Sequence, residues 1–336
     1  MPHHDIVAIG ASAGGLSALK RVVSGLPAGL DAAVLVVQHM KGDQHSELPA
    51  ILERAGPLPA GFAEDGRPAA RGRIHVAPPN HHLLLQGDTL RLNRGAWENG
   101  VRPSVDTLFR SVAVCCGSRG IGVLLTGYLD DGSAGLRALR RCGALTVVQD
   151  PADAEYPDMP RNALEMTEVD HQVALDALPA LLANLVATPA GPPQPVPPEV
   201  QLEADIMAKG YEDDMSLLDR LGDRSVFTCP DCGGVIWELQ DGDALRYRCH
   251  IGHSYSAASF GSALSGEVVR AMETALRTLE ERCRMLRRLG QQSVRQGQSK
   301  AARLWSERAA VFGQQAEAIR AALLRIHATE QPDRPR

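Results

Sequence analysis

An apolar run that leads directly into a glycine-rich turn and then a helical stretch constrains this chain most. The run Ile6–Ile9 is followed by the turn Gly10-Ala11-Ser12-Ala13-Gly14-Gly15, and Leu16–Leu26 has the pattern of a helix. A serine between glycines on such a turn is how α/β enzymes present a nucleophilic hydroxyl group. The free N–H groups of a helix start can also bind a phosphate. The turn alone therefore leaves a nucleophile and a phosphate cradle as alternatives.

The pattern of that first unit is repeated along residues 5–186, where short apolar runs alternate with helical stretches. The expected strands are Ile6–Ile9, Ala33–Val37, Arg73–Ala77, Leu83–Leu85, Ile121–Leu125 and Leu145–Val148. The expected helices are Leu16–Leu26, Ser46–Arg54, Ser104–Cys115 and Gly132–Arg141. Such alternation predicts an α/β fold with a doubly wound, largely parallel sheet. Residues 81–92 are expected to form an antiparallel insertion that turns at Gln86-Gly87-Asp88.

A proline-rich segment then divides the chain. We expect residues 1–186 to form the α/β domain and residues 187–200 to form a stiff linker. Residues 201–262 are expected to hold an acidic segment and a small module rich in cysteine and histidine, and residues 263–330 a helical tail. Residues 199–262 carry 12 acids and 5 Lys or Arg, whereas residues 263–336 carry 8 acids and 14 Lys or Arg. Mutual attraction and a basic partner-binding surface both remain open as explanations.

The helical tail carries two apolar seams with alternating spacings of four and three residues. The first seam comprises Val268, Met272, Ala275, Leu279, Arg282, Leu286 and Leu289, and it is interrupted only by the arginine. The second seam comprises Trp305, Ala309, Phe312, Ala316, Ile319, Leu323 and Ile326. This spacing predicts either a helical hairpin within one chain or a coiled-coil seam for a second chain or partner, with a break near residues 290–299.

Composition restricts the setting in which this chain acts. The net charge of −5 gives no reason to expect nucleic acid as a partner. The chain shows no signal peptide before Ile6, and no apolar stretch reaches the ~18 residues that a membrane span needs. Three of the seven cysteines cluster between residues 229 and 249, which favours metal binding over disulfides. We therefore expect a cytoplasmic protein that does not insert into a membrane.

Two further strand ends carry residues that suit catalysis. The second strand ends in Gln38-His39-Met40, where a dinucleotide-binding fold would place an acid for the ribose. Such a fold would also place a glycine at Ser12. His39 is therefore either a catalytic imidazole or a buried structural one. A later strand leads into Thr126-Gly127-Tyr128-Leu129-Asp130-Asp131-Gly132, where either acid is a helix cap or the carboxylate that orients an imidazole.

Five ordered motifs together resemble the catalytic domain of the chemotaxis methylesterase (CheB) family over about residues 5–186. They are residues 10–15, Gln38-His39-Met40, Arg102-Pro103-Ser104-Val105-Asp106, residues 125–132 with Asp131-Gly132, and Met159-Pro160-Arg161. The resemblance implies hydrolysis of γ-glutamyl methyl esters on chemoreceptors, with deamidation of glutamine as a second activity. It implies that Ser12 is the nucleophile, His39 the general base and acid, and Asp131 the orienting carboxylate. It implies no cofactor for catalysis.

The chain departs from the family pattern at the turns and at its start. Ala13 stands where the family often has threonine, and Tyr128-Leu129 stand where it often has Met-Gly. Backbone N–H groups survive both changes, so those of Ala13 and Tyr128 are the expected oxyanion donors. The first strand begins at Ile6, which leaves no room for the receiver domain that many family members carry. We therefore expect control to lie in the C-terminal half or in a separate receiver protein.

A second site is expected in the cysteine and histidine module. Cys229-Pro-Asp-Cys232 is followed after 16 residues by Cys249-His250-Ile251-Gly252-His253. Two such pairs predict a zinc ribbon, because thiolates and imidazole suit a tetrahedral ion, with a redox pair and a metal-free module as the alternatives. His250 directly follows a ligand, so His253 is the better fourth ligand beside Cys229, Cys232 and Cys249. Four protein ligands would make this zinc structural.

Three functions stay open at this point. The first is a serine esterase of chemoreceptor or chemoreceptor-like signalling, with the C-terminal half used for docking or regulation. The second is a non-catalytic chemosensory adaptor that binds through residues 201–330. The third is a hydrolase that acts on another carboxyl ester or amide. The presence of Ser12, His39 and Asp131 together argues against the adaptor, because a scaffold needs none of them.

Overall fold

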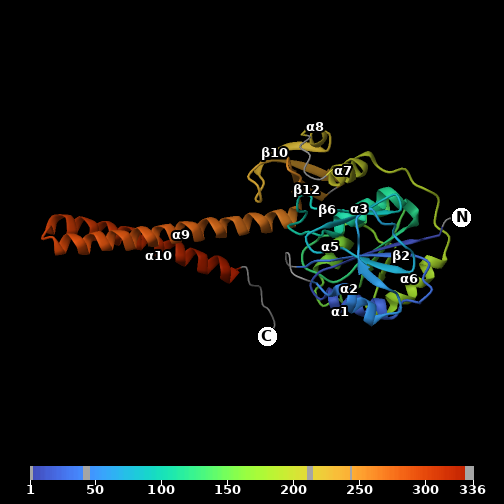
Figure 1. Cartoon of the computed structure of the whole chain (residues 1–336). Coiled ribbons are helices and arrows are strands. Elements are labelled where there is room, and N and C mark those ends of the chain that lie inside the picture. The colour runs from blue at the N-terminus through green and yellow to red at the C-terminus, as the bar shows by residue number, and fades with distance from the viewer. Residues whose placement is uncertain (1–2, 41–45, 210–214, 243, 330–336) are drawn as a thin grey trace. The chain divides into compact units, whose positions relative to one another are not determined.

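Seven parallel strands form the central sheet of the computed structural model, which describes residues 3–40, 46–209, 215–242 and 244–329 (Figure 1). Their order across the sheet is β3-β4-β2-β1-β7-β8-β9. The strands are β1 (Ile6–Ala11), β2 (Ala33–Gln38), β3 (Ala60–Phe62), β4 (Arg73–Val76), β7 (Gly120–Leu124), β8 (Leu145–Gln149) and β9 (His171–Val173). The chain thus builds the sheet outward from β1 in both directions, which makes the β1–β7 boundary its topological switch point.

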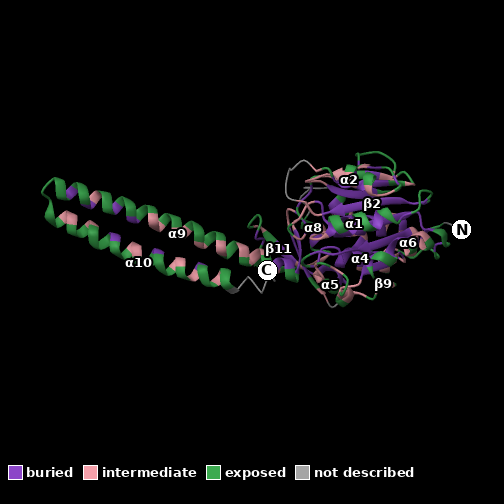
Figure 2. Cartoon of the chain, turned by 90° about the horizontal axis from the view of Figure 1, so that it is seen from below, coloured by how far each residue is buried: buried purple, intermediate pink, exposed green. Residues whose placement is uncertain are grey.

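Helices cover both faces of this sheet. The helices α1 (Gly15–Ser24), α2 (Leu48–Ala55) and α6 (Leu178–Ala187) share one core with Val7 and Ile9 of β1. The helices α3 (Val105–Cys116), α4 (Ser133–Arg141) and α5 (Asp158–Met166) share the other core with Ile6 and Ala8. Alternate residues of one strand therefore enter opposite cores, and the strands are buried in Figure 2. The doubly wound α/β prediction is confirmed.

The elements that the sequence pattern missed are short or lie at the margins of the sheet. β3 and β9 have three residues each, too few to show a periodicity, and α5 and α6 were not expected either. Two 3-10 turns, η1 (Gly117–Arg119) and η2 (Leu175–Ala177), complete this part of the chain. The antiparallel insertion is present as the hairpin β5 (His82–Gln86) and β6 (Thr89–Asn93).

The cysteine and histidine module is a four-stranded antiparallel sheet. Its strands are β10 (Gly222–Thr228), β11 (Val235–Asp241), β12 (Ala244–Cys249) and β13 (Ser254–Ser256), paired in that order. The helices α7 (Pro198–Lys209) and α8 (Met215–Leu218) precede it. Residues 1–260 form one compact unit, so this ribbon packs in the same unit as the parallel sheet.

Residues 261–336 form a second compact unit. It contains most of α9 (Ala257–Arg295) and α10 (Ser299–Thr329), which pack on each other as a hairpin. The second predicted seam faces this contact, with Ala309, Ala316 and Leu323 buried. On α9, Leu286 of the first seam is buried, and so is Cys283, which follows the seam position Arg282. The Cys283 thiol donates to the Ala309 carbonyl, while Arg282 lies over the Phe312 ring. Among the described helices, none is long and apolar enough to cross a bilayer.

Candidate active site and metal centre

Ser12 lies in the turn between β1 and α1, beside the switch point of the sheet. Its N–H donates to the Thr126 carbonyl at 3.0 Å, which ties this turn to the one that follows β7. Gly14 has φ 73°, a left-handed conformation that favours glycine. Gly10 is needed for a different reason, because a Cβ there would lie 2.2 Å from a methyl group of Val105. The glycines thus allow a tight turn that leaves the Ser12 side chain half-buried at the end of the strand.

His39 stands between Ser12 and Asp131. It directly follows β2, and its backbone N–H donates to the Ala11 carbonyl at 3.1 Å. Its Nδ1 is 3.0 Å from Ser12 Oγ, and its Nε2 is 2.7 Å from Asp131 Oδ2. A carboxylate at Nε2 favours the tautomer that carries the proton there, so Nδ1 presents its lone pair to the serine. In chymotrypsin Nε2 faces the serine and Nδ1 faces the aspartate, whereas here Nδ1 faces Ser12 and Nε2 faces Asp131. In both arrangements one ring nitrogen contacts the serine and the other contacts the carboxylate.

Asp131 is held by the start of α3. Its carboxylate accepts hydrogen bonds from Ser104 Oγ at 2.8 Å, Asn99 Nδ2 at 3.0 Å, Val105 N at 2.7 Å and Asp106 N at 3.3 Å. Burial acts to raise the pKa of Asp131, but the hydrogen bond and charge of His39 and the other donors bring it below the ordinary value. Asp131 is therefore ionised, and the N-terminus of α3 adds favourable potential.

The neighbouring acids differ from Asp131 in their surroundings. Asp130 is buried, and its Oδ1 has no hydrogen-bond partner among the described residues. Burial raises the pKa of Asp130 above its ordinary value. Burial and the charge of Asp131 raise the pKa of Asp106 well above its ordinary value, although Gly135 N donates to it at 2.6 Å. Of the two acids between which the sequence motif left a choice, it is Asp131 that contacts His39.

The two expected oxyanion donors flank the serine. Ala13 directly follows Ser12, and its carbonyl accepts from Thr126 Oγ1 at 3.1 Å. Tyr128 follows Gly127, where a Cβ would lie only 2.6 Å from the Cβ of Ser12. The Tyr128 side chain is exposed and its ring lies 4.7 Å from that of Tyr156. The structure thus brings both backbone segments to Ser12, and their role as donors stays a prediction.

Sequence reasoning missed the residues that support the triad. The Arg-Pro-Ser-Val-Asp motif carried the signal, since it opens α3 and supplies three of the donors to Asp131. Gln38 was quoted without a role, and its Nε2 donates to the Ser12 carbonyl at 2.7 Å. Asn99 had no local signal, because its partners Asp131 and Ser256 are distant in sequence.

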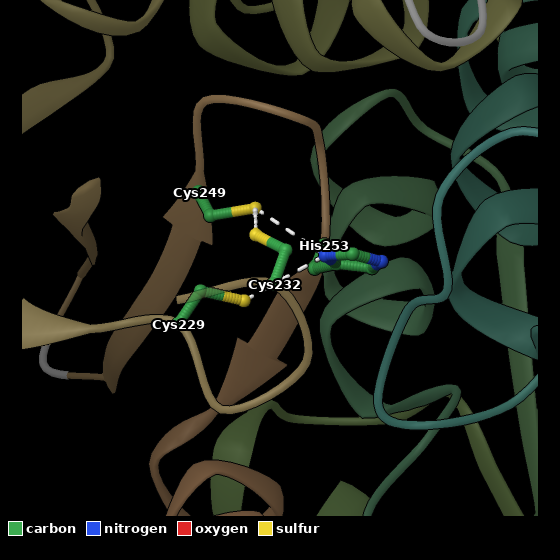
Figure 3. Close-up of side chains that lie close together, drawn as sticks. All are labelled: Cys229, Cys232, Cys249 and His253. Carbon is green, nitrogen blue, oxygen red and sulfur yellow. Dashed lines mark hydrogen bonds between the residues drawn. The ribbon is translucent and has the colours of Figure 1, made fainter. Parts of the chain in front are cut away.

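The cysteine and histidine cluster comes together in the ribbon (Figure 3). The ligand atoms of Cys229, Cys232, Cys249 and His253 all lie within 4.8 Å of one another. Cys232 Sγ is 3.7 Å from Cys249 Sγ, and His253 Nδ1 is 3.5 Å from Cys249 Sγ. Bond lengths of ~2.3 Å for Zn–S and ~2.0 Å for Zn–N in a tetrahedral site need separations of this size. The donor set and spacing therefore fit a zinc ion.

The other groups near the cluster fit the same interpretation. His250 does not join it, and its ring lies against Gly234, where a Cβ would be 1.9 Å away. Tyr255 contacts the Cys229 thiol at 3.4 Å and donates to Asp231 Oδ2 at 2.6 Å. Such outer contacts commonly orient metal ligands. Among the two candidate histidines, the geometry favours His253.

Comparison with known proteins finds relatives of the parallel-sheet part of the chain. The family described as CheB methylesterase matches residues 7–182. A Leptospira interrogans protein is 37% identical over 184 residues, which cover 54% of this chain and 95% of the relative. The Pseudomonas aeruginosa protein-glutamate methylesterase/protein-glutamine glutaminase 2 is 39% identical over 186 residues, covering 54% of this chain and 53% of the relative. The chain thus spans nearly all of one relative and about half of the other.

A solved structure agrees with these similarities. The CheB methylesterase catalytic domain of Thermotoga maritima matches with a TM-score of 0.52 and 30% identity, covering 54% of this chain and 98% of that domain. The matched region contains the parallel sheet and the turns that carry Ser12, His39 and Asp131. This chain belongs to the CheB methylesterase family.

Proposed function

We propose that this chain is a serine hydrolase that removes methyl groups from glutamyl γ-methyl esters of chemoreceptors or chemoreceptor-like proteins. We propose deamidation of glutamine in such proteins as its second activity. The observation that carries the proposal is the hydrogen-bonded series Ser12–His39–Asp131 at the switch point of a CheB-family sheet. The relatives' names, which join a protein-glutamate methylesterase and a protein-glutamine glutaminase, support the choice of substrate.

In the proposed first half of the reaction, Ser12 becomes acylated. His39 Nδ1 takes the proton of Ser12 Oγ as Oγ attacks the ester carbonyl carbon. The backbone N–H groups of Ala13 and Tyr128 bind the oxyanion, and donors of this kind typically contribute ~10²–10³ each in rate. Asp131 stabilises the positive charge that forms on His39. The imidazolium then gives its proton to the departing methoxy oxygen, so methanol leaves and the glutamyl group stays on Ser12.

In the second half, water releases the glutamate. His39 takes a proton from the water, whose oxygen attacks the acyl carbon. Collapse of the second tetrahedral intermediate breaks the bond to Ser12 Oγ, which recovers the proton from His39. The product is a γ-carboxylate. With a glutamine side chain the same steps apply, and the proton from His39 goes to nitrogen, so ammonia leaves in place of methanol.

Replacing Ser12 tests the proposed nucleophile. Ser12→Ala should lower methanol release from a methylated receptor by roughly 10⁴-fold or more, because it removes the hydroxyl group that is proposed to form the acyl intermediate. Ser17→Ala removes an exposed serine of α1 and is the matched control that should retain activity. Full activity in the Ser12 variant would refute the assignment of the triad.

The same preparation separates the alternative functions. A non-catalytic adaptor would neither release methanol nor react with a serine-directed fluorophosphonate. A hydrolase of another ester or amide would react with the fluorophosphonate at Ser12 but would leave the methylated receptor intact. The exposed Tyr128, which contacts Tyr156, stands at the position where the family pattern differs and is the place to look for such a change of substrate.

We also propose that Cys229, Cys232, Cys249 and His253 hold a structural zinc ion. Three thiolates and one imidazole saturate a tetrahedral ion, which leaves no position for a substrate. The support is the spacing of the four ligand atoms within 4.8 Å and the contact of Tyr255 with the Cys229 thiol. When bound, zinc would tie the Cys229–Cys232 turn to the end of β12.

Metal analysis tests that proposal. The purified chain should contain one zinc per molecule, and Cys229→Ser should lose most of it, because a serine hydroxyl is a poor ligand for zinc. Cys115→Ser changes a thiol outside the cluster and should keep the metal. Zinc content that is equal in both variants would exclude this site.

We place the reaction in the cytoplasm, since a zinc site of three thiolates requires reduced cysteines. We further propose that a separate receiver protein or chemosensory regulator binds to residues 201–330. The exposed Val268, Met285 and Val311 of the α9–α10 hairpin are apolar positions available to such a partner. Binding of purified receiver proteins to the full chain, measured with these side chains changed to serine, tests this.

A further inference from the structure

The edge of the ribbon reaches the loop that precedes α3. The Asn99 N–H donates to the Ser254 carbonyl at 2.7 Å, and the Ser254 N–H donates to the Trp97 carbonyl at 3.1 Å. The side-chain oxygen of Asn99 accepts from Ser256 N and from Ser259 Oγ, each at 2.9 Å. Both main chain and side chain of Asn99 are thus bound to β13 and the start of α9.

The other end of the same amide reaches the triad. Asn99 Nδ2 donates to Asp131 Oδ1 at 3.0 Å and to Asp106 Oδ2 at 2.8 Å. The amide therefore uses both its donors on carboxyl groups and both its acceptor positions on β13 and the start of α9. Rotating the amide would place its NH₂ against the Ser256 N–H donor and its oxygen against the Asp131 carboxylate. The surroundings fix one orientation.

A buried ion network anchors the loop next to this amide. Glu98 pairs with Arg110 of α3 at 2.9 Å and with Arg246 of β12 at 3.5 Å. Glu203 of α7 pairs with the same two arginines, at 3.3 Å and 2.9 Å. All four side chains are buried, so neither water nor salt screens these pairs strongly. Glu98, the residue before Asn99, thus ties the ribbon to α3. These buried ion pairs hold the ribbon where Asn99 contacts it.

We infer that Asn99 is a positioning residue through which the docked ribbon holds the Asp131 carboxylate against His39. The inference rests on the proposed function. Ser256 N and Ser259 Oγ fix the amide oxygen, and the amide nitrogen then bridges the neighbouring carboxyl groups of Asp131 and Asp106. Without this bridge Asp131 Oδ1 loses one of its donors, and the carboxylate is held less firmly against His39 Nε2. The ribbon is in this way part of the scaffold of the active site.

Three variants of the full chain test the role of the amide by kcat and KM for methanol release. Asn99→Gly keeps the backbone unstrained, because φ is 54°, and should lower kcat about tenfold with KM unchanged. Asn99→Asp keeps the shape but adds a third carboxylate facing Asp131 and Asp106, and should lower kcat about 100-fold. Ser259→Ala should lower kcat about threefold. A space-filling role would give the reverse order for the two Asn99 variants.

A double variant tests whether the ribbon acts through Asn99. Ser259→Ala added to Asn99→Gly should lower kcat no further, because the oxygen that Ser259 binds is already gone. Ser118→Ala is the control for loss of a buried hydroxyl, since Ser118 Oγ donates to the Gly191 carbonyl away from the triad, and it should leave kcat unchanged. A threefold loss in the Asn99→Gly background would overturn the inference.

A second readout separates this inference from the proposed function. The rate of fluorophosphonate labelling at Ser12 reports the activation of the serine without any receptor, and should follow the same order of variants. Wild-type labelling without methanol release would refute the proposed substrate, and the order of the labelling rates would still support or overturn the role of Asn99. Equal rates in all variants overturn it, and a wild type that neither labels nor releases methanol overturns both proposals.

Discussion

Two groups of buried carboxylates lie on either side of the adjacent residues Glu98 and Asn99. Glu98 belongs to the first group, and Asn99 binds Asp131 of the second. The negative charges of the two groups are stabilised in different ways. Glu98 and Glu203 are surrounded by arginines, whereas Asp131 is held mainly by uncharged N–H and O–H donors and by His39. Burial acts to raise the pKa of Glu203, but the charges of Arg110 and Arg246 bring it to about 2. The ion pairs fix the ribbon in place, since Glu98 and Glu203 each pair with both Arg110 and Arg246.

Among the described contacts of Asp131 there is no arginine, which suits its proposed role beside His39. A cation there would cancel the negative potential that stabilises His39 when it takes a proton. Uncharged donors orient the carboxylate without cancelling its negative charge, which can then stabilise the protonated imidazole of His39. The comparison therefore predicts that changes in the first group mainly affect stability and that changes in the second mainly affect rate.

Among changes in these two groups of carboxylates, the largest effect is expected from Asp131→Asn. An amide NH₂ in the place of Oδ2 would make His39 Nε2 an acceptor, so the imidazole proton would sit on Nδ1 and face Ser12. An imidazole in that tautomer cannot take the serine proton, and the loss of the matching tautomer in a serine protease costs about 10⁴ in kcat. We expect kcat for methanol release to fall by roughly 10³–10⁴.

The adjacent acid provides the control for that measurement. Asp130→Asn changes an equally buried carboxylate that does not contact His39, and should alter kcat by less than about threefold. If the two variants lose activity equally, the orienting role of Asp131 is wrong and the distinction between the two carboxylate groups fails with it.

A large effect on stability is expected from Glu203→Gln. The neutral side chain would leave Arg110 and Arg246 with less counter-charge in a buried site, which typically costs about 3–5 kcal/mol. Urea unfolding followed by near-ultraviolet circular dichroism measures this change. The folded variant should keep a kcat close to that of the wild type.

An exposed ion pair gives the matched comparison. Glu307→Gln removes the partner of Arg303 on the surface of α10, where solvent screens the pair, and should change the unfolding free energy little. Equal destabilisation by both variants would show that the buried network does not anchor the ribbon. A loss of kcat in the Glu203 variant as large as that of Asp131→Asn would show that the two groups are not separate.

The fold was predictable because its signals are local, and so was the sheet edge at which Ser12, His39 and Asp131 lie. Each of these three residues follows its own strand, and the apolar strands and glycine turns are visible in short windows, so a parallel sheet brings the three turns to one edge. Their catalytic roles were taken from the family resemblance and stay a proposal. The four cysteine and histidine ligands lie within 25 residues of one another in two short motifs. The motif at residues 102–106 identified the start of α3 without showing that it binds Asp131.

The support of the site was not predictable, because it depends on pairs of residues that are far apart in the chain. Asn99 and Ser259 are separated by 160 residues, and Glu98 meets Arg246 only after the ribbon has folded. Arg282 shows the same limit in the tail, where a regular spacing placed it in the seam but the adjacent Cys283 is the buried residue. Which side chains are buried or paired in these places depends on residues that are distant in the sequence.

The last expected effect is a pH dependence of stability that differs between the buried acids Glu203 and Asp106. A carboxylate whose pKa is lowered by folding stabilises the folded state above its ordinary pKa, and this contribution is lost as the pH falls toward the folded value. For Glu203 the window lies between pH 4.5 and about 2, and the loss is of the order of 3 kcal/mol. The raised pKa of Asp106 has the opposite effect on stability, so its protonation stabilises the fold as the pH falls.

Unfolding free energies of the wild type and Glu203→Gln should therefore converge below pH 4.5, since metal loss and the other acids affect both proteins alike. Curves that stay parallel down to pH 3 would show that the arginines do not hold Glu203 ionised.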